Sequence, residues 1–474
     1  MLALSWYQLL LLATIFAVPL FLMMKRDGDA LLLWLIAVIC TDVFNGRTGV
    51  NVSAASVAGL LLMPYSARIL LHFKKAPPIG WVSAHFAYLV VLGLVFGFGF
   101  PWHDTIGRPL NLQAQGRTVL YLMREAAGFS IAVFIAQQVA KAGRPDRVLT
   151  AILVAAFVTC AFAVLEYVTG ISWYLLFNEG VRAPTYWNLR VRGLNFEPRG
   201  LGTIAAHAFV IGTLCIAYRR HIRLAAGTFA SGAAAIFFSA STSGLIAAAA
   251  GLGAVSMAHR RIRRRLLRSA VPIVLVGAAV VWANWNRVAA LQHLLSVRVG
   301  STVRYGPAST WFQEIAYRLE VFDTVAALFL AANPVYWLIG TGPGLISIPA
   351  TPLLPITPYT VVYIGPGVNS PPTMGIVLEL ANGGLIALIL WIGFVLSAAR
   401  ALRWASQQPG PDQPSWFVAR WSFVGAAAVY LMAAGFLSSC WPLFIGLGLG
   451  AAFMRQQSSP LAAQTLAEPV EVRP

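Results

Sequence analysis

Long apolar runs bounded by charged or polar residues recur along nearly the whole chain, and they constrain the fold more than any other feature. A helix needs about 20 such residues to cross a hydrocarbon core of roughly 30 Å. The runs lack period-two alternation, and a backbone exposed to lipid must satisfy its own hydrogen bonds, which favours helices over a barrel. The sequence therefore predicts an all-α polytopic membrane protein with about 12–13 transmembrane helices. The expected spans are 5–24, 30–44, 52–67, 79–100, 118–140, 148–167, 201–218, 224–240, 243–257, 269–286, 375–397, 417–437 and 441–454.

The composition excludes an ordinary soluble domain, because 58% of the 474 residues are apolar and only 11% are charged. Cys40, Cys160 and Cys215 fall inside predicted spans and Cys440 directly precedes the last one, so we expect neither a disulfide framework nor a thiolate metal site. No histidine pair has metal spacing. We therefore predict that the protein uses no cofactor and no metal. A charged segment follows the first apolar run and does not precede it, which argues against a cleaved signal peptide.

The net charge of +18 comes from basic residues that sit between spans in alternate loops, which indicates membrane topology and not nucleic-acid binding. Placing these loops in the cytoplasm leaves four segments outside, at 45–51, 101–117, 168–200 and 287–374. The predicted domains are a helical bundle (1–286) with the outer loop 168–200, a large periplasmic loop (287–374), C-terminal spans (375–454) and a disordered cytoplasmic tail (455–474).

The two longest outer segments carry eight arginines, although the positive-inside rule predicts few there. A guanidinium matches phosphate or carboxylate oxygens with two hydrogen bonds, where lysine offers a point charge. Contact with lipid headgroups or with nearby acidic side chains is the alternative, and it is the better interpretation for Arg182, Arg287 and Arg298. The arginines for which we predict binding of a phosphate-bearing or acidic ligand are Arg192, Arg199, Arg304 and Arg318.

The segment "RVRGLNFEPRG" (190–200) places four charges directly before a predicted span. Pro198 and Gly200 precede the apolar run, so Glu197 and Arg199 are expected at a helix entrance. A glutamate there suits the positive end of the helix dipole. Capping therefore explains Glu197 but leaves the arginines of this segment without a local reason.

Two other segments predict turns between helices. "FFSASTSGLIAAAAG" carries small hydroxyl residues between apolar runs, which favours a helix hairpin over a catalytic role. In the large loop, "YRLEVFDTVAALFLAANPVYWLIGTGPG" predicts an amphipathic surface helix carrying Arg318 and Glu320, then a break at Asn333 and Pro334 and a glycine turn. The proline-rich stretch that follows suits a mobile lid, a substrate channel or a tether.

Glu125, Glu166 and Glu379 are carboxylates within predicted spans. Asn382 lies three residues after Glu379 and so shares its helix face. An ionisable group at membrane depth points to function, although polar contacts between helices are a common alternative. Glu379 is the most interesting of the three because it is nearest to the large loop.

The order of these features resembles the O-antigen ligase and O-antigen polymerase superfamily, bacterial inner-membrane glycosyltransferases of the type C architecture. "RGLNFEPRGLG" is similar to the family's R-x-G-x-F-x-E-P segment, and "SASTSGLIA" to its Ser-rich helix turn. "YRLEVFDTVAAL" with "NPVYWLIGTGPG" resembles the arginine-led helix and the glycine turn of the family's large loop. "VNSPPTMGIVLELANGGLIAL" resembles the H-N-S segment that leads into E-x-G-x-x-G. The resemblance covers roughly residues 150–400.

The resemblance implies transfer of a glycan from an undecaprenyl-pyrophosphate donor to a sugar hydroxyl acceptor, at the periplasmic face of the bacterial inner membrane. Its partners would be membrane lipid and a chain-length regulator or other assembly proteins. Preorganised guanidinium groups would stabilise the leaving pyrophosphate and a carboxylate would accept the hydroxyl proton. The residues expected to be catalytic are Glu197, Arg199, Arg318 and Glu320, and those expected to bind substrate are Arg190, Arg192, Arg304, Asn369 and Glu379.

One departure from the family pattern separates its branches. Many ligases carry histidine before the Asn-Ser pair, where this chain has Val368 followed by Asn369. This favours a polymerase of repeat units over a ligase to lipid A core or protein. A transporter or flippase of the same lipid-linked sugars is a further alternative, but it would more often show internal repeats and charges at mid-depth of several spans.

Overall fold

The structure is a computed structural model, and the residues that it describes are 6–25, 27–39, 54–73, 77–100, 102, 113–142, 145–174, 191–195, 198–239, 241–258, 263–264, 321–350, 372, 374–433 and 441–457. Of these residues 88% are helical, and none of them forms a strand. The all-α class predicted from the sequence is therefore confirmed for the described part of the chain.

The structure first describes a series of helices between residues 6 and 258. They are α1 (Trp6–Lys25), α2 (Gly28–Ile39), α3 (Ala54–Phe73), α4 (Pro77–Leu92) with the π-helical segment η1 (Gly93–Phe98), α5 (Ala114–Ala142), α6 (Pro145–Thr169), α8 (Pro198–Ala217), α9 (Ile222–Ser239) and α10 (Thr242–Ala258). The later helices are α14 (Val321–Ala332), α15 (Pro334–Ile339), α16 (Ser347–Ala350), α18 (Gly375–Gln407), α19 (Gln413–Ala433) and α20 (Trp441–Gln457).

Twelve of the thirteen predicted spans coincide with helices, and the span expected at 269–286 lies outside the described residues. The largest difference in length is in α18, which continues to Gln407 and not to 397. Within the described residues, six helices are long and apolar enough to cross a membrane: α4 with η1, α5, α6, α8, α9 and α18. Their outward faces expose large apolar side chains such as Val91, Leu94 and Leu396, which in water would carry a large free-energy cost. The architecture is that of a multi-pass helical membrane protein.

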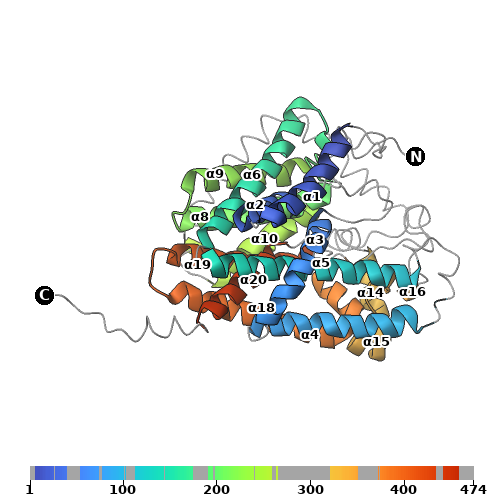
Figure 1. The fold of residues 1–474 in the computed structure, drawn as a ribbon. Coiled ribbons are helices and arrows are strands. Elements are labelled where there is room, and N and C mark those ends of the chain that lie inside the picture. The colour runs from blue at the N-terminus through green and yellow to red at the C-terminus, as the bar shows by residue number, and fades with distance from the viewer. Residues whose placement is uncertain are drawn as a thin grey trace.

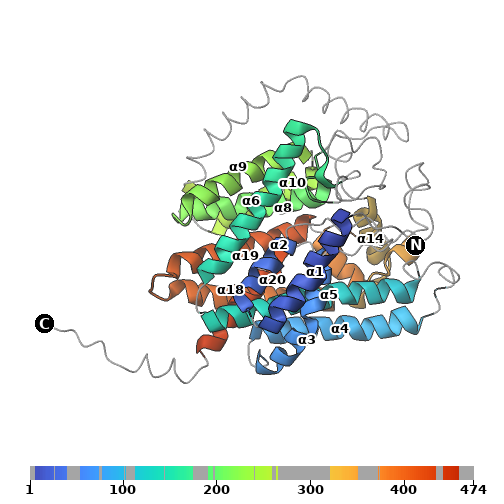
Figure 2. The same ribbon diagram turned by 45° about the horizontal axis from the view of Figure 1, so that its top comes forward.

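Two groups of helices are joined by the C-terminal helices. In Figure 1, α6, α8, α9 and α10 lie on one side and α3, α4 and α5 on the other. α19 packs against both α10 and α18, while α18 packs on α4 and α20 packs on α5, so the C-terminal helices bridge the two groups. The view in Figure 2 shows the same separation from another direction. The main apolar core therefore draws residues from the beginning, middle and end of the chain.

The bundle has two ends that differ in chemistry. We call the loop end the one where η1 stops, where α5, α8 and α18 begin, and where α9 turns into α10. The short helices α14, α15 and α16 also lie there (Figure 1). The opposite end, which we call the basic end, carries Lys25, Arg219, Arg220, Arg223, Arg400 and Arg403.

A hydrogen-bond network around Asp146 holds the basic end together. The Ser415 hydroxyl donates to Asp146 Oδ1 at 2.6 Å, and His221 Nε2 lies 3.1 Å from Asp146 Oδ2. Arg220 Nη2 lies 3.8 Å from Asp146 Oδ1 and donates to the Pro411 carbonyl. These contacts connect the start of α6, the α8–α9 turn and the start of α19. They therefore hold these three elements together at the basic end, which is opposite to the loop end.

Candidate functional site

Residues 191–195, a described part of the segment "RVRGLNFEPRG", form a buried turn. We call it the Arg192 turn. Val191 N–H donates to the Phe238 carbonyl at the end of α9, and Asn195 N–H donates back to the Arg192 carbonyl at 3.0 Å. Gly193 adopts φ 58°, a left-handed conformation that glycine accepts without strain. A Cβ at Gly193 would lie 3.3 Å from Ala163 of α6, so the turn also packs closely on that helix. The turn is therefore rigidly placed between α6, α8 and α9.

Glu166 forms hydrogen bonds with the backbone of this turn. Its Oε2 atom accepts hydrogen bonds from the N–H groups of Gly193 at 2.5 Å and of Arg192 at 3.2 Å. Glu166 is 8% exposed near the end of α6, where an ionised carboxylate needs such donors to offset its lost hydration. The carboxylate thus acts as the anchor of the turn, and its charge faces the charge of the Arg192 side chain.

The Arg192 guanidinium is buried, with 2% of the residue exposed. It lies over the Tyr174 ring, 5.6 Å from the ring centroid. Burial lowers the pKa of the Arg192 guanidinium, while the negative charge of Glu166 acts in the opposite direction. A guanidinium remains charged at neutral pH even so, because its ordinary pKa exceeds 12. Contact with lipid headgroups requires an exposed arginine, so the burial of Arg192 argues against that interpretation.

Asn195 completes the polar lining of the turn. It is buried, and within the described part of the chain neither the oxygen nor the nitrogen of its side-chain amide has a hydrogen-bond partner. A Cβ on Gly200 would lie 3.8 Å from Asn195 Oδ1, which places this amide beside the first turn of α8. The start of a helix carries partial positive charge and suits an anion. The Arg192 turn therefore carries a buried cation and, three residues later, a buried amide beside the start of a helix.

The turn between α9 and α10 supports this arrangement. A Cβ on Gly202 would lie 2.5 Å from Ser241 Cβ, so α8 and the Ser-rich turn are in close contact. The Ser241 hydroxyl accepts a hydrogen bond from Gly244 N–H at 3.1 Å, as a helix cap does. The turn predicted for this segment is confirmed, with α9 ending at Ser239 and α10 beginning at Thr242. The two helices pack mainly against other elements and not against each other as in a hairpin: α9 against α6 and α8, and α10 against α8 and α19.

A second buried polar cluster joins α4, α18 and α19, and we call it the Glu379 triad. Glu379 Oε2 lies 2.8 Å from His85 Nε2, and Glu379 Oε1 accepts a hydrogen bond from the Tyr430 hydroxyl at 2.6 Å. Glu379 is 0% exposed, so both of its oxygens are occupied within the protein. The carboxyl of Glu125 on α5 interacts electrostatically with His85 and Glu379. Because both of its oxygens are bonded within the protein, the Glu379 carboxylate is better suited to hold α4, α18 and α19 together than to contact a substrate.

The glycine turn after α15, residues 340–347, docks on a break in α18. Gly384 has non-helical angles, φ 63° and ψ −160°, which interrupts the helix and leaves the Ala381 carbonyl without its usual helical donor. Thr341 takes over that carbonyl with both its N–H at 2.8 Å and its hydroxyl at 2.9 Å. Asn382 Oδ1 accepts Gly344 N–H at 3.0 Å. Glu379 and Asn382 thus share a buried stretch of α18, as predicted, but they have different partners.

The start of α5 holds the other side of this turn. Arg117 Nη1 donates to the Ser347 hydroxyl at 2.7 Å, and the Thr118 hydroxyl donates to the Pro343 carbonyl at 3.3 Å. The predicted break at Asn333 and Pro334 is confirmed, because α14 ends at Ala332 and α15 begins at Pro334. The buried face of α14 packs on α18 through Ala326 and Leu330, so this helix has a protein partner along that face.

Of the predicted site residues, the structure describes the side chains of Arg192 and Glu379. Arg199 lies in the first turn of α8, and only its backbone is described. α8 begins at Pro198, three residues before the span predicted from Leu201, which agrees with proline as a first helical residue. The predicted site residues outside the described part of the chain are Arg190, Glu197, Arg304, Arg318, Glu320 and Asn369.

The sequence did not predict several residues of these clusters as site residues. Asn195 stands within the quoted motif, but nothing in its spacing marks it as buried. The sequence marks Glu166 as a charge within a predicted span, but it does not indicate that the backbone of the turn is its partner. His85 and Tyr430 are isolated in the sequence and meet Glu379 only through packing. Isolated polar residues inside apolar runs were the one available signal for all of them.

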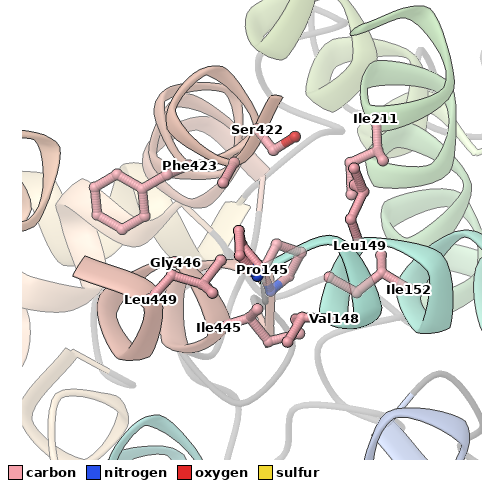
Figure 3. A pocket seen from close by; sticks show the side chains of 12 residues that line it. Pro145, Val148, Leu149, Ile152, Ile211, Ser422, Phe423, Ile445, Gly446 and Leu449 are labelled. Carbon is pink, nitrogen blue, oxygen red and sulfur yellow. The ribbon is translucent and has the colours of Figure 1, made fainter. Parts of the chain in front are cut away.

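Two cavities of the described structure lie away from both clusters. Figure 3 shows an apolar one between α6, α8, α19 and α20, lined by Leu149, Ile211 and Phe423 among others, with a volume of about 30 Å³. That volume is near the space of one water molecule, which excludes a glycan or a lipid chain. Within the described ranges, no three His, Cys, Asp or Glu side chains form a group suited to a metal ion.

Neither a scan against protein-family models nor a search of the curated proteins finds a match for this chain. The functional interpretation therefore rests on the residues and their geometry.

Proposed function

We propose that this protein is a membrane glycosyltransferase that polymerises oligosaccharide repeat units carried on undecaprenyl pyrophosphate. The observation that carries the proposal is the Arg192 turn at the loop end, which carries a buried guanidinium and, three residues later, a buried amide beside the start of α8. Its sequence is the same "RGLNFEPRG" that resembles the polymerase and ligase superfamily. The loop end then faces the periplasm and the basic end faces the cytoplasm, in a bacterial inner membrane.

The chemistry of the transfer requires a cation where the leaving group forms. The acceptor hydroxyl attacks the anomeric carbon, the bond to the pyrophosphate oxygen breaks, and the hydroxyl proton passes to a base. Charge develops on the pyrophosphate, and a donor that is held in place before the reaction stabilises it by about 2.7–4 kcal/mol in comparable sites. Arg192 acts in a surrounding of low polarity, where attraction between charges is several times stronger than in water.

The roles of the other predicted residues stay with this proposal. Arg190, Arg199, Arg304 and Arg318 complete the pyrophosphate site, and Asn369 contacts the donor. Glu197 is the first candidate for the base, with Glu320 behind it. The occupied oxygens of Glu379 favour a positioning role over contact with the substrate. A chain-length regulator or another assembly protein is the proposed protein partner.

A ligase that transfers the glycan to lipid A core or to protein is the second candidate. The shared donor chemistry supports it, whereas Val368 in place of the ligase histidine favours polymerisation. A transporter of the same lipid is the third candidate. The Glu379 triad lies within spans, as transporter charges do, but its side chains bond one another.

The decisive experiment incubates the purified full-length protein with lipid-pyrophosphate oligosaccharide and follows chain length by gel electrophoresis. We expect a ladder of polymer with the native protein and at least about a 100-fold slower reaction with Arg192→Ala. Arg192→Lys keeps the charge but loses the paired donors, so its rate should lie between the two. Asn195→Ala should raise the KM for the donor, because it removes the free amide.

Arg403→Ala is the matched control, since Arg403 is an exposed arginine on α18 at the basic end. Its rate should equal that of the native protein. Transfer to an added acceptor without elongation would identify the ligase, and movement of the lipid across a vesicle without any new glycosidic bond would identify the transporter. Native rates with both Arg192 variants would overturn the assignment of the site.

A further inference from the structure

A second site lies at the basic end, far from the Arg192 turn. A groove of about 480 Å³ opens between the start of α4, the second half of α18 and the end of α20. Its volume falls within the range of about 300–1,000 Å³ that is usual for small-molecule sites. Apart from Arg400, its walls are apolar or uncharged, and no Asp or Glu among the described residues lines it.

The groove is built by one face of α18. Ile392, Leu396, Arg400 and Trp404 follow one another at helical spacing, so their side chains stand in one row along the helix. Gly393 admits the Trp81 ring of α4 on the same face, since a Cβ there would lie 2.5 Å from a ring carbon. The groove therefore depends on a specific small residue, and its shape is set by packing between two helices.

The order of side chains along the row matches the parts of a phospholipid. Leu396 and Ile392 are exposed apolar residues, as a wall for an acyl chain would be. Arg400 stands toward the basic end, where a guanidinium can donate two hydrogen bonds to a phosphate. Trp81 is 41% exposed and Trp404 is 51% exposed, and tryptophan favours the boundary between lipid chains and headgroups.

The charge of this end selects the headgroup. Arg400 is the charged residue among the described residues that line the groove, and no acidic residue there neutralises it, so the groove carries a positive field. Such a field attracts a lipid with a net negative headgroup and gives little preference to one whose net charge is zero. We propose that this groove binds an anionic glycerophospholipid, with an acyl chain along Leu396 and the phosphate on Arg400.

This site is independent of the glycosyltransferase proposal, because it uses none of the residues at the loop end. A bound phospholipid would fill the space between α4, α18 and α20. It would thereby stabilise the same helices that carry His85 and Glu379.

The test uses the two groove tryptophans as reporters. The purified full-length protein in detergent is titrated with phosphatidylglycerol whose acyl chains carry bromine, which quenches tryptophan fluorescence on contact, and in parallel with brominated phosphatidylcholine. We expect saturable quenching by phosphatidylglycerol at about tenfold lower concentration than by phosphatidylcholine. The double variant Trp81→Phe with Trp404→Phe should lose the part of the quenching that is specific to phosphatidylglycerol.

Arg400→Gln and Arg403→Gln form the matched pair. Arg400 lines the groove and Arg403 does not, although both are exposed arginines on the same helix. We expect Arg400→Gln to weaken phosphatidylglycerol binding about tenfold and Arg403→Gln to change it less than twofold. Native mass spectrometry should show one phospholipid mass retained by the native protein and lost in Arg400→Gln.

Equal quenching of the native protein by both lipids would overturn the proposal, and this comparison needs no variant that has to fold. Equal loss of binding in both arginine variants would also overturn it, because a general surface charge would then explain the preference. A dimer mass whose formation protects Trp81 and Trp404 from both lipids would show that a second copy of the chain occupies the groove instead.

Discussion

Glu166 and Glu379 are both buried carboxylates toward the loop end of the bundle. Glu166 stabilises the fold of a turn, whereas Glu379 stabilises contacts between helices. Glu166 accepts two backbone N–H groups from a five-residue turn and faces one arginine. Glu379 bonds two side chains, His85 and Tyr430, that come from different helices. The first carboxylate therefore positions a loop that carries a candidate ligand group, and the second locks helices together. Burial of a charge by itself does not distinguish a site from a structural contact; the partners do.

The comparison predicts that the largest loss of stability follows from breaking the Glu379 triad. Glu379→Ala leaves His85 and the Tyr430 hydroxyl buried without their partner, and such a loss costs about 3–5 kcal/mol. We expect the purified variant to unfold at clearly lower temperature, as measured by intrinsic fluorescence in detergent. Replacing two members of the triad, Glu379→Leu with His85→Leu, should recover part of that loss, because the buried imidazole is removed together with its partner and only the Tyr430 hydroxyl is left unsatisfied. A single variant as stable as the native protein would show that the triad does not hold the helices.

Glu166→Gln should have a smaller and local effect. The amide oxygen still accepts hydrogen bonds, but without charge, and charge-assisted bonds contribute about 1.5–3 kcal/mol. Hydrogen exchange measured by mass spectrometry should show faster exchange at the Arg192 and Gly193 amides, while peptides from the middle of α5 exchange as in the native protein. Faster exchange throughout the bundle would contradict the distinction between the two carboxylates, because Glu166 would then stabilise the packing of the helices, as Glu379 does.

Gly340→Ala probes the uncharged turn after α15 and should destabilise it, because the new methyl group would collide with the backbone of α18. Gly340 has φ 76°, and a Cβ would lie 2.5 Å from the Gly383 nitrogen. A left-handed conformation costs a residue with a Cβ about 1–2 kcal/mol, before any displacement of α18. Gly253→Ala in α10 is the control, because no atom lies within 4 Å of its Cβ position, and it should be neutral or stabilising. Equal thermal stability of the two variants would show that the turn does not depend on its contact with α18.

The helices could be predicted from the sequence because an apolar run of membrane-spanning length leaves the backbone few alternatives. The turn between α9 and α10 and the break before α15 were also predictable, since small hydroxyl residues and an Asn-Pro pair act on their own local backbone. The end of α18 was less predictable. Its polar last turns continue the helix beyond the apolar run, so hydropathy stops before the helix does.

The partners of the charged residues could not be predicted in the same way. His85 and Glu379 are separated by 294 positions, and no local pattern relates them. Arg192 and Glu166 are closer in sequence, but the contact depends on how the turn folds back over the end of α6. The sequence identified Arg192 as a ligand candidate through its place in an outer segment, and its burial came from packing.

The sequence by itself determined that this chain is an all-helical membrane protein with its basic residues between spans, because the cost of exposing polar backbone to lipid acts on every residue of a run. Only the tertiary structure decided that Glu166 anchors the Arg192 turn, that His85 and Tyr430 share Glu379, and that Gly393 opens a groove beside Trp81. These contacts form because side chains from helices far apart in the sequence lie at the same depth in the bundle. That depth is set by the packing of the whole bundle.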